Sequence, residues 1–446
     1  MTVKFSKLDL PAPDGMAHAA DGMKSEEIPM KEEILPDSLC LDRPFQTKLK
    51  EDAVEYSMPT PLVLLLAVAT GMTVASIYYA QPLLEAIRTT LGMDVTDAGL
   101  IITASQLGYA IGLVLLVPLG DLFQRRKLVV IMTFGIAASL AGIGFSADGS
   151  VLLLLSVVVG ALSVVAQILV AFSADLAGAA ERGRVVGTVM SGLLLGVLLA
   201  RTVAGILAQI WGWRMVFWLA AGSMMVITLA MYRGLPFREP NAGSGYLALL
   251  KSMPAMFMEE RILRLRSLYG AIAFGIFSVL WTPLAFLLSK SPFNYEPGII
   301  GLFGLAGVAG ASAASIAGRL ADRGSSGRTT FAAIVLLIVS WLPIWWGRHS
   351  VLLLIAGLVL TDLGVQFLHI TNQSEIYRLH PEARSRLTSV YMSCFFFGGV
   401  VGSSVSALVY AKAGWTGVCA IGTVLGILAA VIWVVERNGQ NMEGSS

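Results

Sequence analysis

The feature that most constrains this chain is a run of apolar stretches, each about 20 residues long, separated by short polar loops from Pro59 onward. A helix of that length spans the roughly 30 Å hydrocarbon core of a bilayer. Only 13% of the residues are charged, whereas soluble domains carry about 25%. The pattern therefore predicts an all-α integral membrane protein with twelve transmembrane helices, at residues 59–84, 98–119, 127–147, 151–173, 185–209, 214–233, 267–289, 298–320, 329–347, 350–376, 386–411 and 414–436.

Polar segments divide the chain into five parts. Residues 1–57 carry seven basic and twelve acidic residues and no apolar signal-peptide core, which favours a disordered cytoplasmic tail. Such a tail is either a solvated extension or a regulatory docking segment. The longest internal polar segment, 234–266, is predicted to be a cytoplasmic linker between two six-helix bundles at 58–233 and 267–437, and 438–446 is a second cytoplasmic tail.

Basic residues are distributed unevenly between the loops. With the N-terminus in the cytoplasm, eighteen Lys and Arg residues outside the tail lie on the cytoplasmic side and five on the outer side. Cytoplasmic loops are enriched in Lys and Arg, so both termini are predicted to be cytoplasmic. We expect a multi-pass protein that acts as a monomer in a bacterial inner membrane, where loops this short are common.

The two sets of spans are related by an internal repeat. At an offset of 202 residues, segment 182–196 aligns with segment 384–398 and matches Arg182, Arg184, Met190, Ser191 and Gly196 with Arg384, Arg386, Met392, Ser393 and Gly398. A duplicated six-helix unit is typical of transporters, whose substrate site lies near the bilayer midplane between the repeats.

These residues resemble the major facilitator superfamily over about residues 59–436. The loop after the eighth predicted span opens with the superfamily's G-x-L-A-D-R signature, as Gly318, Leu320, Ala321, Asp322 and Arg323. The loop after the second span has a weaker copy that keeps Asp121, Arg125 and Arg126. The resemblance implies two pseudo-symmetric six-helix bundles around a central cavity lined by the first, fourth, seventh and tenth spans.

Within the superfamily the chain is similar to the twelve-span drug:proton antiporters. Their fifth span carries a G-x-x-x-G-P-x-x-G-G element. Here "GVLLARTVAG" (196–205) keeps the small residues Gly196, Ala200, Ala204 and Gly205, but Arg201 stands where proline is usual. The resemblance implies proton-coupled export of small amphipathic molecules by alternating access.

Four polar residues form a stripe on the tenth predicted span: Asp362, Gln366, His369 and Gln373. At 100° per residue they lie within roughly 60° of one another. A charge inside the membrane costs at least a few kcal/mol unless it is paired or hydrated, so the stripe is expected to face the cavity. Asp362 is predicted to bind the coupling proton, with a structural hydrogen bond as the alternative. His369 is either a second coupling or substrate-contacting group or a helix–helix contact.

Arg201 is the basic residue that falls inside a predicted span, the fifth. It is predicted to take part in coupling, either by binding an anionic group of the substrate or by balancing Asp362. Alternatively it stabilises the packing of the fifth span, where Gly192, Gly196 and Ala200 share one face.

Other polar and aromatic residues complete the predicted sites. Inside the apolar spans they are candidates to line the substrate cavity: Tyr78, Tyr79, Gln81, Gln106, Tyr109, Gln167, Trp281, Gln366 and Gln373. Charged residues at the cytoplasmic ends recur at nearly the same offset in both halves, which favours a gating network over isolated loop charges: Asp121, Arg125, Arg126, Asp175, Asp322, Arg323 and Glu375.

Taken together, the sequence predicts a secondary active transporter whose partners are protons, a small-molecule substrate and the lipid bilayer. A proton-coupled importer of a small metabolite is the near alternative, and a non-transporting membrane sensor is the more distant one. The sequence contains no G-x-x-x-x-G-K-[S/T] loop for ATP and no HExxH or GxSxG motif. We therefore expect no enzymatic activity, no cofactor, no metal and no nucleic-acid partner.

Overall fold

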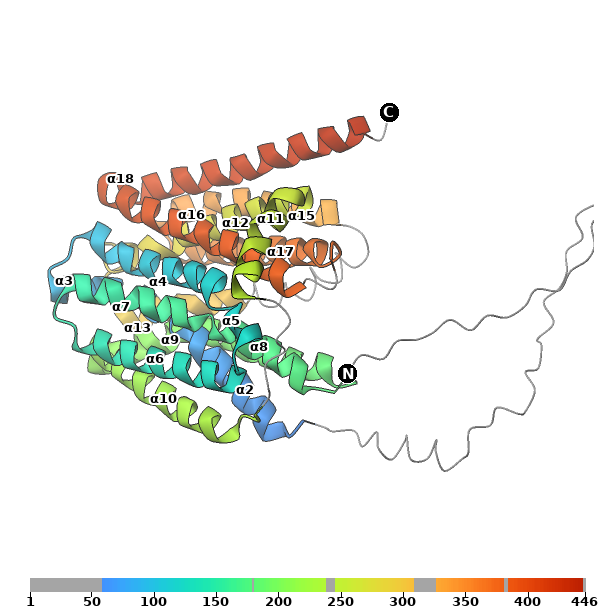
Figure 1. Cartoon of the computed structure of the whole chain (residues 1–446). Helices are drawn as coiled ribbons and strands as arrows, with labels where there is room; N and C mark the ends of the chain where they lie inside the picture. Colours follow the sequence, from blue (N-terminus) through green and yellow to red (C-terminus); the bar gives the residue numbers. More distant parts are fainter. Residues whose placement is uncertain (1–57, 179, 238–244, 309–325, 381–383, 444–446) are drawn as a thin grey trace, which may run out of the picture. The chain divides into compact units, whose positions relative to one another are not determined.

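The computed structural model describes residues 58–178, 180–237, 245–308, 326–380 and 384–443; the predicted tail 1–57 and the predicted gating residues Asp322 and Arg323 lie outside this part. Every regular element within it is helical (Figure 1). Nine helices among the described residues are long and apolar enough to cross a membrane, and two shorter apolar segments are Thr60–Ala75 and Pro297–Ala306. The all-α prediction is confirmed, and the count of twelve spans stays a prediction.

The elements of the first half run from α2 to α10. In chain order they are α2 Thr60–Ala75, the 3-10 helix η2 Gln81–Leu83, α3 Leu84–Leu91, α4 Val95–Leu115, α5 Leu119–Leu122, α6 Arg125–Phe145, α7 Gly149–Ser163, α8 Val165–Leu176, α9 Arg182–Trp211 and α10 Trp213–Gly234. The rest of the chain contributes α11 Tyr246–Glu259, α12 Arg261–Leu288, α13 Pro297–Leu302, η3 Phe303–Ala306, α15 Ser326–Val339, α16 Trp341–Gly347, α17 Val351–Ile376 and α18 Arg384–Glu443.

Several helix boundaries differ from the predicted spans. The first predicted span, 59–84, is α-helical as α2 only to Ala75; turns and the 3-10 helix η2, which contains Pro82, follow it up to Leu83. The fourth span, 151–173, is divided into α7 and α8 at Val164. The linker 234–266 contains helix α11, and α12 begins at Arg261 rather than 267. The last two spans are the arms of α18, which bends at Gly414, where φ is 61°.

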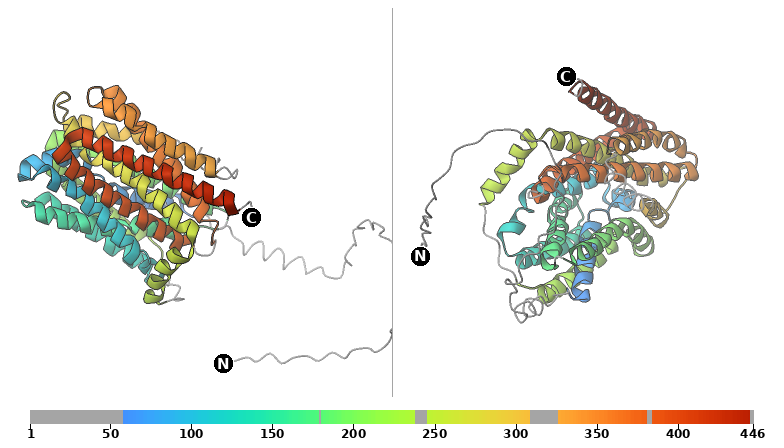
Figure 2. Two further views of the ribbon diagram at one scale, coloured as in Figure 1. Left: turned by 90° about the horizontal axis from the view of Figure 1, so that it is seen from above. Right: turned by 90° about the vertical axis from the view of Figure 1, so that its right-hand side faces the viewer.

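The helices pack in two groups that share an interface. In the first half α4 packs on α7, α2 on α9 and α6 on α10; in the second, α12 packs on α18 and α15 on α17. The halves meet where α4 contacts α18 and where α9 contacts α13. Figures 1 and 2 show α6 and α10 at one side of this bundle, α15 and α18 at the other, and α4 between them. A site between α9, α12 and α17 therefore lies between the halves.

Backbone contact between α2 and α9 fixes where Arg201 lies. A Cβ atom at Gly196 would lie 2.1 Å from the carbonyl oxygen of Gly71, so only glycine fits there. Small residues of this kind let two helices approach until their backbones touch. Because Arg201 follows Gly196 on the same helix, this contact brings it beside the turn that follows α2, which carries Tyr78.

Candidate functional site

The guanidinium group of Arg201 is enclosed by aromatic rings from two other segments. Arg201 is 3% exposed. Its Cζ atom lies 4.2 Å from the centre of the Trp281 ring, 4.8 Å from Tyr78 and 5.5 Å from Phe277. Its Nε atom donates a hydrogen bond to Oε1 of Gln81. Each cation–π contact stabilises a desolvated guanidinium by about 2 kcal/mol, so these contacts offset part of the cost of burying the charge.

Asp362 lies on α17 and is 5% exposed. Its Oδ1 atom accepts a hydrogen bond of 3.4 Å from Nε1 of Trp281. Close packing surrounds the carboxyl group, since a Cβ atom at Gly307 would lie 3.5 Å from Oδ2 of Asp362. The indole of Trp281 thus stacks on Arg201 with its face and binds Asp362 with its N–H group.

A cavity of about 70 Å³ is lined by both charged residues. The remaining walls come from α9, α12 and α17 and from the end of η3, and they are mostly apolar: Leu194, Val197, Leu198, Phe277, Gly307, Val365 and Gln366. The cavity is therefore bounded by both halves of the molecule and carries one basic and one acidic group. Polar groups of opposite charge converging on an apolar pocket are typical of a binding site.

Arg201 and Asp362 are not joined by a salt bridge in the part of the chain that the structure describes. Their opposite charges attract each other across the cavity. Among the described residues, Tyr78 is the other titratable side chain that interacts electrostatically with Arg201. The Nη2 atom of Arg201 is buried and has no hydrogen-bond partner among the described residues. One donor of a buried cation is therefore available to a further group.

His369 lies seven residues beyond Asp362 on α17 and contacts α18. Its Nδ1 atom is 3.0 Å from the hydroxyl of Tyr391, and its ring packs against Phe395 at 4.8 Å between centres. These neighbours match the helix–helix alternative for His369, and the cavity beside Asp362 does not include it. A coupling role for His369 stays a prediction.

Some of the other predicted cavity residues lie beside Arg201 and the cavity, and the rest lie elsewhere between the helices. Tyr78, Gln81 and Trp281 surround Arg201, and Gln366 lines the cavity. Gln167 donates a 3.3 Å hydrogen bond to the hydroxyl of Tyr109, whose ring packs on Phe396 of α18. Gln106 contacts Ser278 of α12 and Ser403 of α18 and so connects the halves. Tyr79 is buried and Gln373 is half-buried, and neither lines this cavity.

The predicted gating residues of the first half lie at one end of their bundle. Arg125, at the start of α6, forms an ion pair with Asp175 of α8, and its Nε atom donates to the carbonyl of Gly120. Arg126 donates to the carbonyl of Tyr232 on α10. In the second half Glu375 pairs with Arg378 at 3.2 Å. The side chain of Asp121 lies outside the described part.

The structure adds two residues, in different places, that the sequence analysis did not name as site residues. Phe277 forms a wall of the cavity; its spacing of four residues from Trp281 on α12 places both rings on one helix face. Arg266, expected in a loop, is 7% exposed on α12, where it donates to Thr330 at 3.0 Å and lies 3.9 Å from Glu436. No local pattern marks Arg266, because α15 and α18 supply its partners.

Comparison with known proteins gives consistent matches over nearly the whole described part. The model of the Major Facilitator Superfamily matches residues 64–350 and 267–445. "Uncharacterized transporter YgaY" of Escherichia coli is 50% identical over 378 residues, covering 85% of this chain and 96% of the relative. "Probable transporter SCO4007" of Streptomyces coelicolor is 33% identical over 358 residues, with coverages of 80% and 83%. The "Chloramphenicol resistance protein" of Streptomyces lividans is 27% identical over 287 residues, with coverages of 64% and 72%.

The fold also matches a solved structure. The crystal structure of a bacterial homolog of the human lysosomal transporter Spinster superposes with a TM-score of 0.67 at 14% identity, covering 84% of this chain and 96% of that one. At this identity the match concerns the fold alone. With the family model and the close relatives, it shows that the chain is a multi-pass membrane transporter rather than an enzyme and that it belongs to the Major Facilitator Superfamily.

Proposed function

We propose that this transporter couples substrate movement to protons through Asp362. Twelve spans would form two six-helix bundles, 58–233 and 267–437, joined by the cytoplasmic linker 234–266, with both termini in the cytoplasm. The alternation of about 20-residue apolar stretches with short loops and the bias of basic residues support this arrangement. Residues 438–446 would form the cytoplasmic C-terminal tail.

The observation that carries the proposal is a carboxyl group and a guanidinium group buried at one cavity between the halves without a salt bridge between them. Asp362 forms no salt bridge among the described residues, and its hydrogen-bond donor is the neutral indole N–H of Trp281. Gain and loss of one proton then changes the charge of the cavity by one unit. That change is the simplest way to link protonation to rocking of the halves.

Two directions of coupling fit this site. Export by proton antiport is supported by the name of the Streptomyces lividans relative, a chloramphenicol resistance protein. Import by proton symport is supported by the buried Arg201, whose unpaired Nη2 atom suits an anionic substrate group. In both, the Arg125–Asp175 ion pair would act in gating by holding α6 against α8 in one of the alternating states.

The test of proton coupling is transport in proteoliposomes under an imposed pH gradient, with labelled chloramphenicol and labelled benzoate as probes. Transporter-free liposomes give the baseline, because neutral benzoic acid itself crosses a bilayer under a pH gradient. We expect one probe to accumulate above this baseline and against its concentration gradient, and a protonophore to abolish that accumulation. Accumulation that persists when the protonophore has dissipated the pH gradient would show that protons do not drive the transporter.

Replacement of Trp281 by phenylalanine should weaken gradient-driven transport by a factor of about two to ten, because a hydrogen bond as long as this one contributes about 0.5–1.5 kcal/mol. Phenylalanine keeps a ring beneath Arg201 but removes the N–H group that binds Asp362. Trp341→Phe is the matched control, since its buried Nε1 atom has no hydrogen-bond partner among the described residues. Initial uptake rates measure the effect, and equal rates in the two variants would contradict it.

A further inference from the structure

Arg201 is a buried cation whose hydrogen bonding is incomplete. Its Nε atom binds the neutral amide of Gln81, its ring neighbours are Trp281, Tyr78 and Phe277, and its Nη2 atom has no partner among the described residues. Asp362 attracts Arg201 across the cavity but forms no salt bridge with it among the described residues, and a buried charge without a hydrogen-bonded counter-ion is costly. The site therefore favours an anion that can accept hydrogen bonds from this guanidinium.

The residues around Arg201 also limit the polarity and charge of the rest of such a ligand. Leucine, valine and phenylalanine side chains of α9, α12 and α17 form most of the cavity wall. Asp362 is the acidic group at this wall, and Tyr78 is the other titratable neighbour in the described part of the chain. A cationic ligand would be repelled by Arg201. An anion with an apolar body would meet the guanidinium group at one end and the apolar wall at the other when Asp362 is protonated.

We propose that the transported compounds are small amphipathic anions, such as aromatic or aliphatic carboxylates, and that their anionic group binds Arg201. The inference rests on the proposed transport site and adds to it the class of substrate. Arginine suits this role because its planar guanidinium presents two parallel donors to a carboxylate. Binding would satisfy the Nη2 atom, which has no hydrogen-bond partner among the described residues.

The position of Asp362 makes anion binding depend on a proton. An ionised Asp362 and a bound carboxylate would both face the cavity that Arg201 lines, and like charges repel at such distances. Protonation of Asp362 removes this repulsion and leaves a hydroxyl that can donate to the ligand. The anion and the proton therefore bind together, which favours symport over antiport for these compounds.

The experiment measures binding to the purified full-length transporter by the shift in unfolding temperature, with benzoate as the probe and benzamide as its neutral counterpart. We expect benzoate to stabilise the wild type at pH 6 and benzamide not to. Benzoate remains ionised between pH 6 and pH 8, so its affinity should fall with rising pH, by up to about tenfold per unit where one proton is taken up on binding. Equal shifts with both compounds would overturn the inference, and this comparison needs no variant.

Two variants assign the effect to its residues. Arg201→Gln should abolish the benzoate shift. Arg214→Gln, which removes another arginine that stacks on a ring, at 4.3 Å from Trp213, should leave it unchanged. Undiminished benzoate affinity in Arg201→Gln would refute the anion site. Asp362→Asn should keep benzoate binding and lose its pH dependence. A pH-independent affinity in the wild type would refute proton coupling through Asp362 but leave the anion site in place.

Discussion

Asp362→Asn should abolish gradient-driven accumulation of substrate while leaving exchange of labelled for unlabelled substrate intact. Asparagine has nearly the same shape as aspartate, and its Oδ1 atom can still accept the hydrogen bond from Trp281. The cavity walls should therefore keep their packing. The amide cannot gain or lose a proton, so the coupling between protonation and rocking of the halves is lost. Accumulation in proteoliposomes under a pH gradient and exchange at equal pH measure the two processes separately.

A matched control for this variant lies one turn away on the same helix face. Gln366→Leu also changes a polar group that lines the cavity, but it removes no titratable group. It should alter apparent affinity and retain accumulation. If Asp362→Asn accumulated substrate as well as the wild type, another group would carry the proton, and His369 would be the next candidate.

Gly301→Ala should prevent α13 from packing on α9 and so inhibit transport. A Cβ atom at Gly301 would lie 2.5 Å from the carbonyl oxygen of Arg201, a contact with backbone that a side-chain movement cannot relieve. The carbonyl oxygen of Gly301 itself accepts a 3.0 Å hydrogen bond from Thr202, and Gln209 donates to Glu296 further along. Overpacking of this kind costs about 1–3 kcal/mol. Because the contact joins the two halves, the cost should shift the population toward the state in which they separate at this end.

The reactivity of a cysteine introduced in place of Gln209 reports whether this contact opens. In a background in which the native cysteines are replaced by serine, a membrane-impermeant thiol reagent should label Gln209→Cys faster when Gly301→Ala is present. Gly222→Ala on α10 is the control, because a Cβ atom there would have nothing within 4 Å. Unchanged labelling with retained transport would show that the α9–α13 contact does not separate during the cycle.

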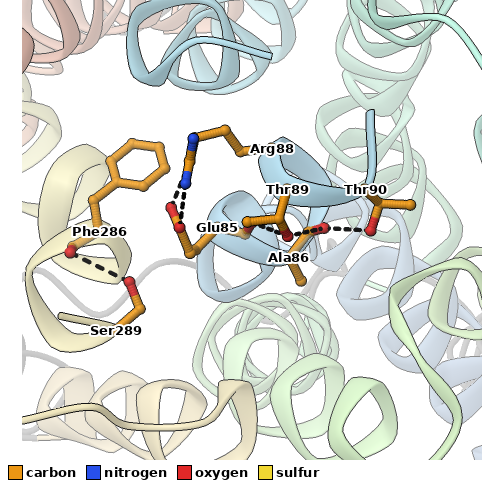
Figure 3. A network of polar contacts seen from close by, with 7 residues as sticks. All are labelled: Glu85, Ala86, Arg88, Thr89, Thr90, Phe286 and Ser289. Carbon is orange, nitrogen blue, oxygen red and sulfur yellow. Dashed lines mark hydrogen bonds and ion pairs between the residues drawn. The ribbon is translucent and has the colours of Figure 1, made fainter. Parts of the chain in front are cut away.

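The halves also lie side by side at the ends of α3 and α12. Figure 3 shows Glu85 and Arg88 of α3 beside Phe286 of α12 and Ser289, which follows α12; the ion pair between Glu85 and Arg88, at 2.6 Å, forms within α3 itself. Both side chains are partly exposed, so this pair contributes little to stability. Glycine contacts such as that of Gly301 are therefore better places than this ion pair to perturb the interface between the halves.

The elements that could be predicted from sequence are those set by local composition. The spacing of apolar stretches predicts the spans, and α4, α6, α9 and α10 occur close to where those stretches place them. Boundaries were less predictable where one residue changes the local geometry, as at Gly414 within α18. Helix α11, which is largely apolar, was missed because a 14-residue helix in a linker lacks the length of a span.

The sequence by itself determined that the chain is a duplicated, all-helical membrane protein and that Asp362 and Gln366 share one face of a helix. Periodicity along one helix suffices for such conclusions. Only the tertiary structure decided what these groups meet. Gln81 lies 120 residues from Arg201 in the sequence, and Trp281 lies 81 residues from Asp362, yet each pair is hydrogen-bonded. Such partners depend on how helices from both halves pack, and the unpaired donor of Arg201 follows from that packing rather than from any local pattern.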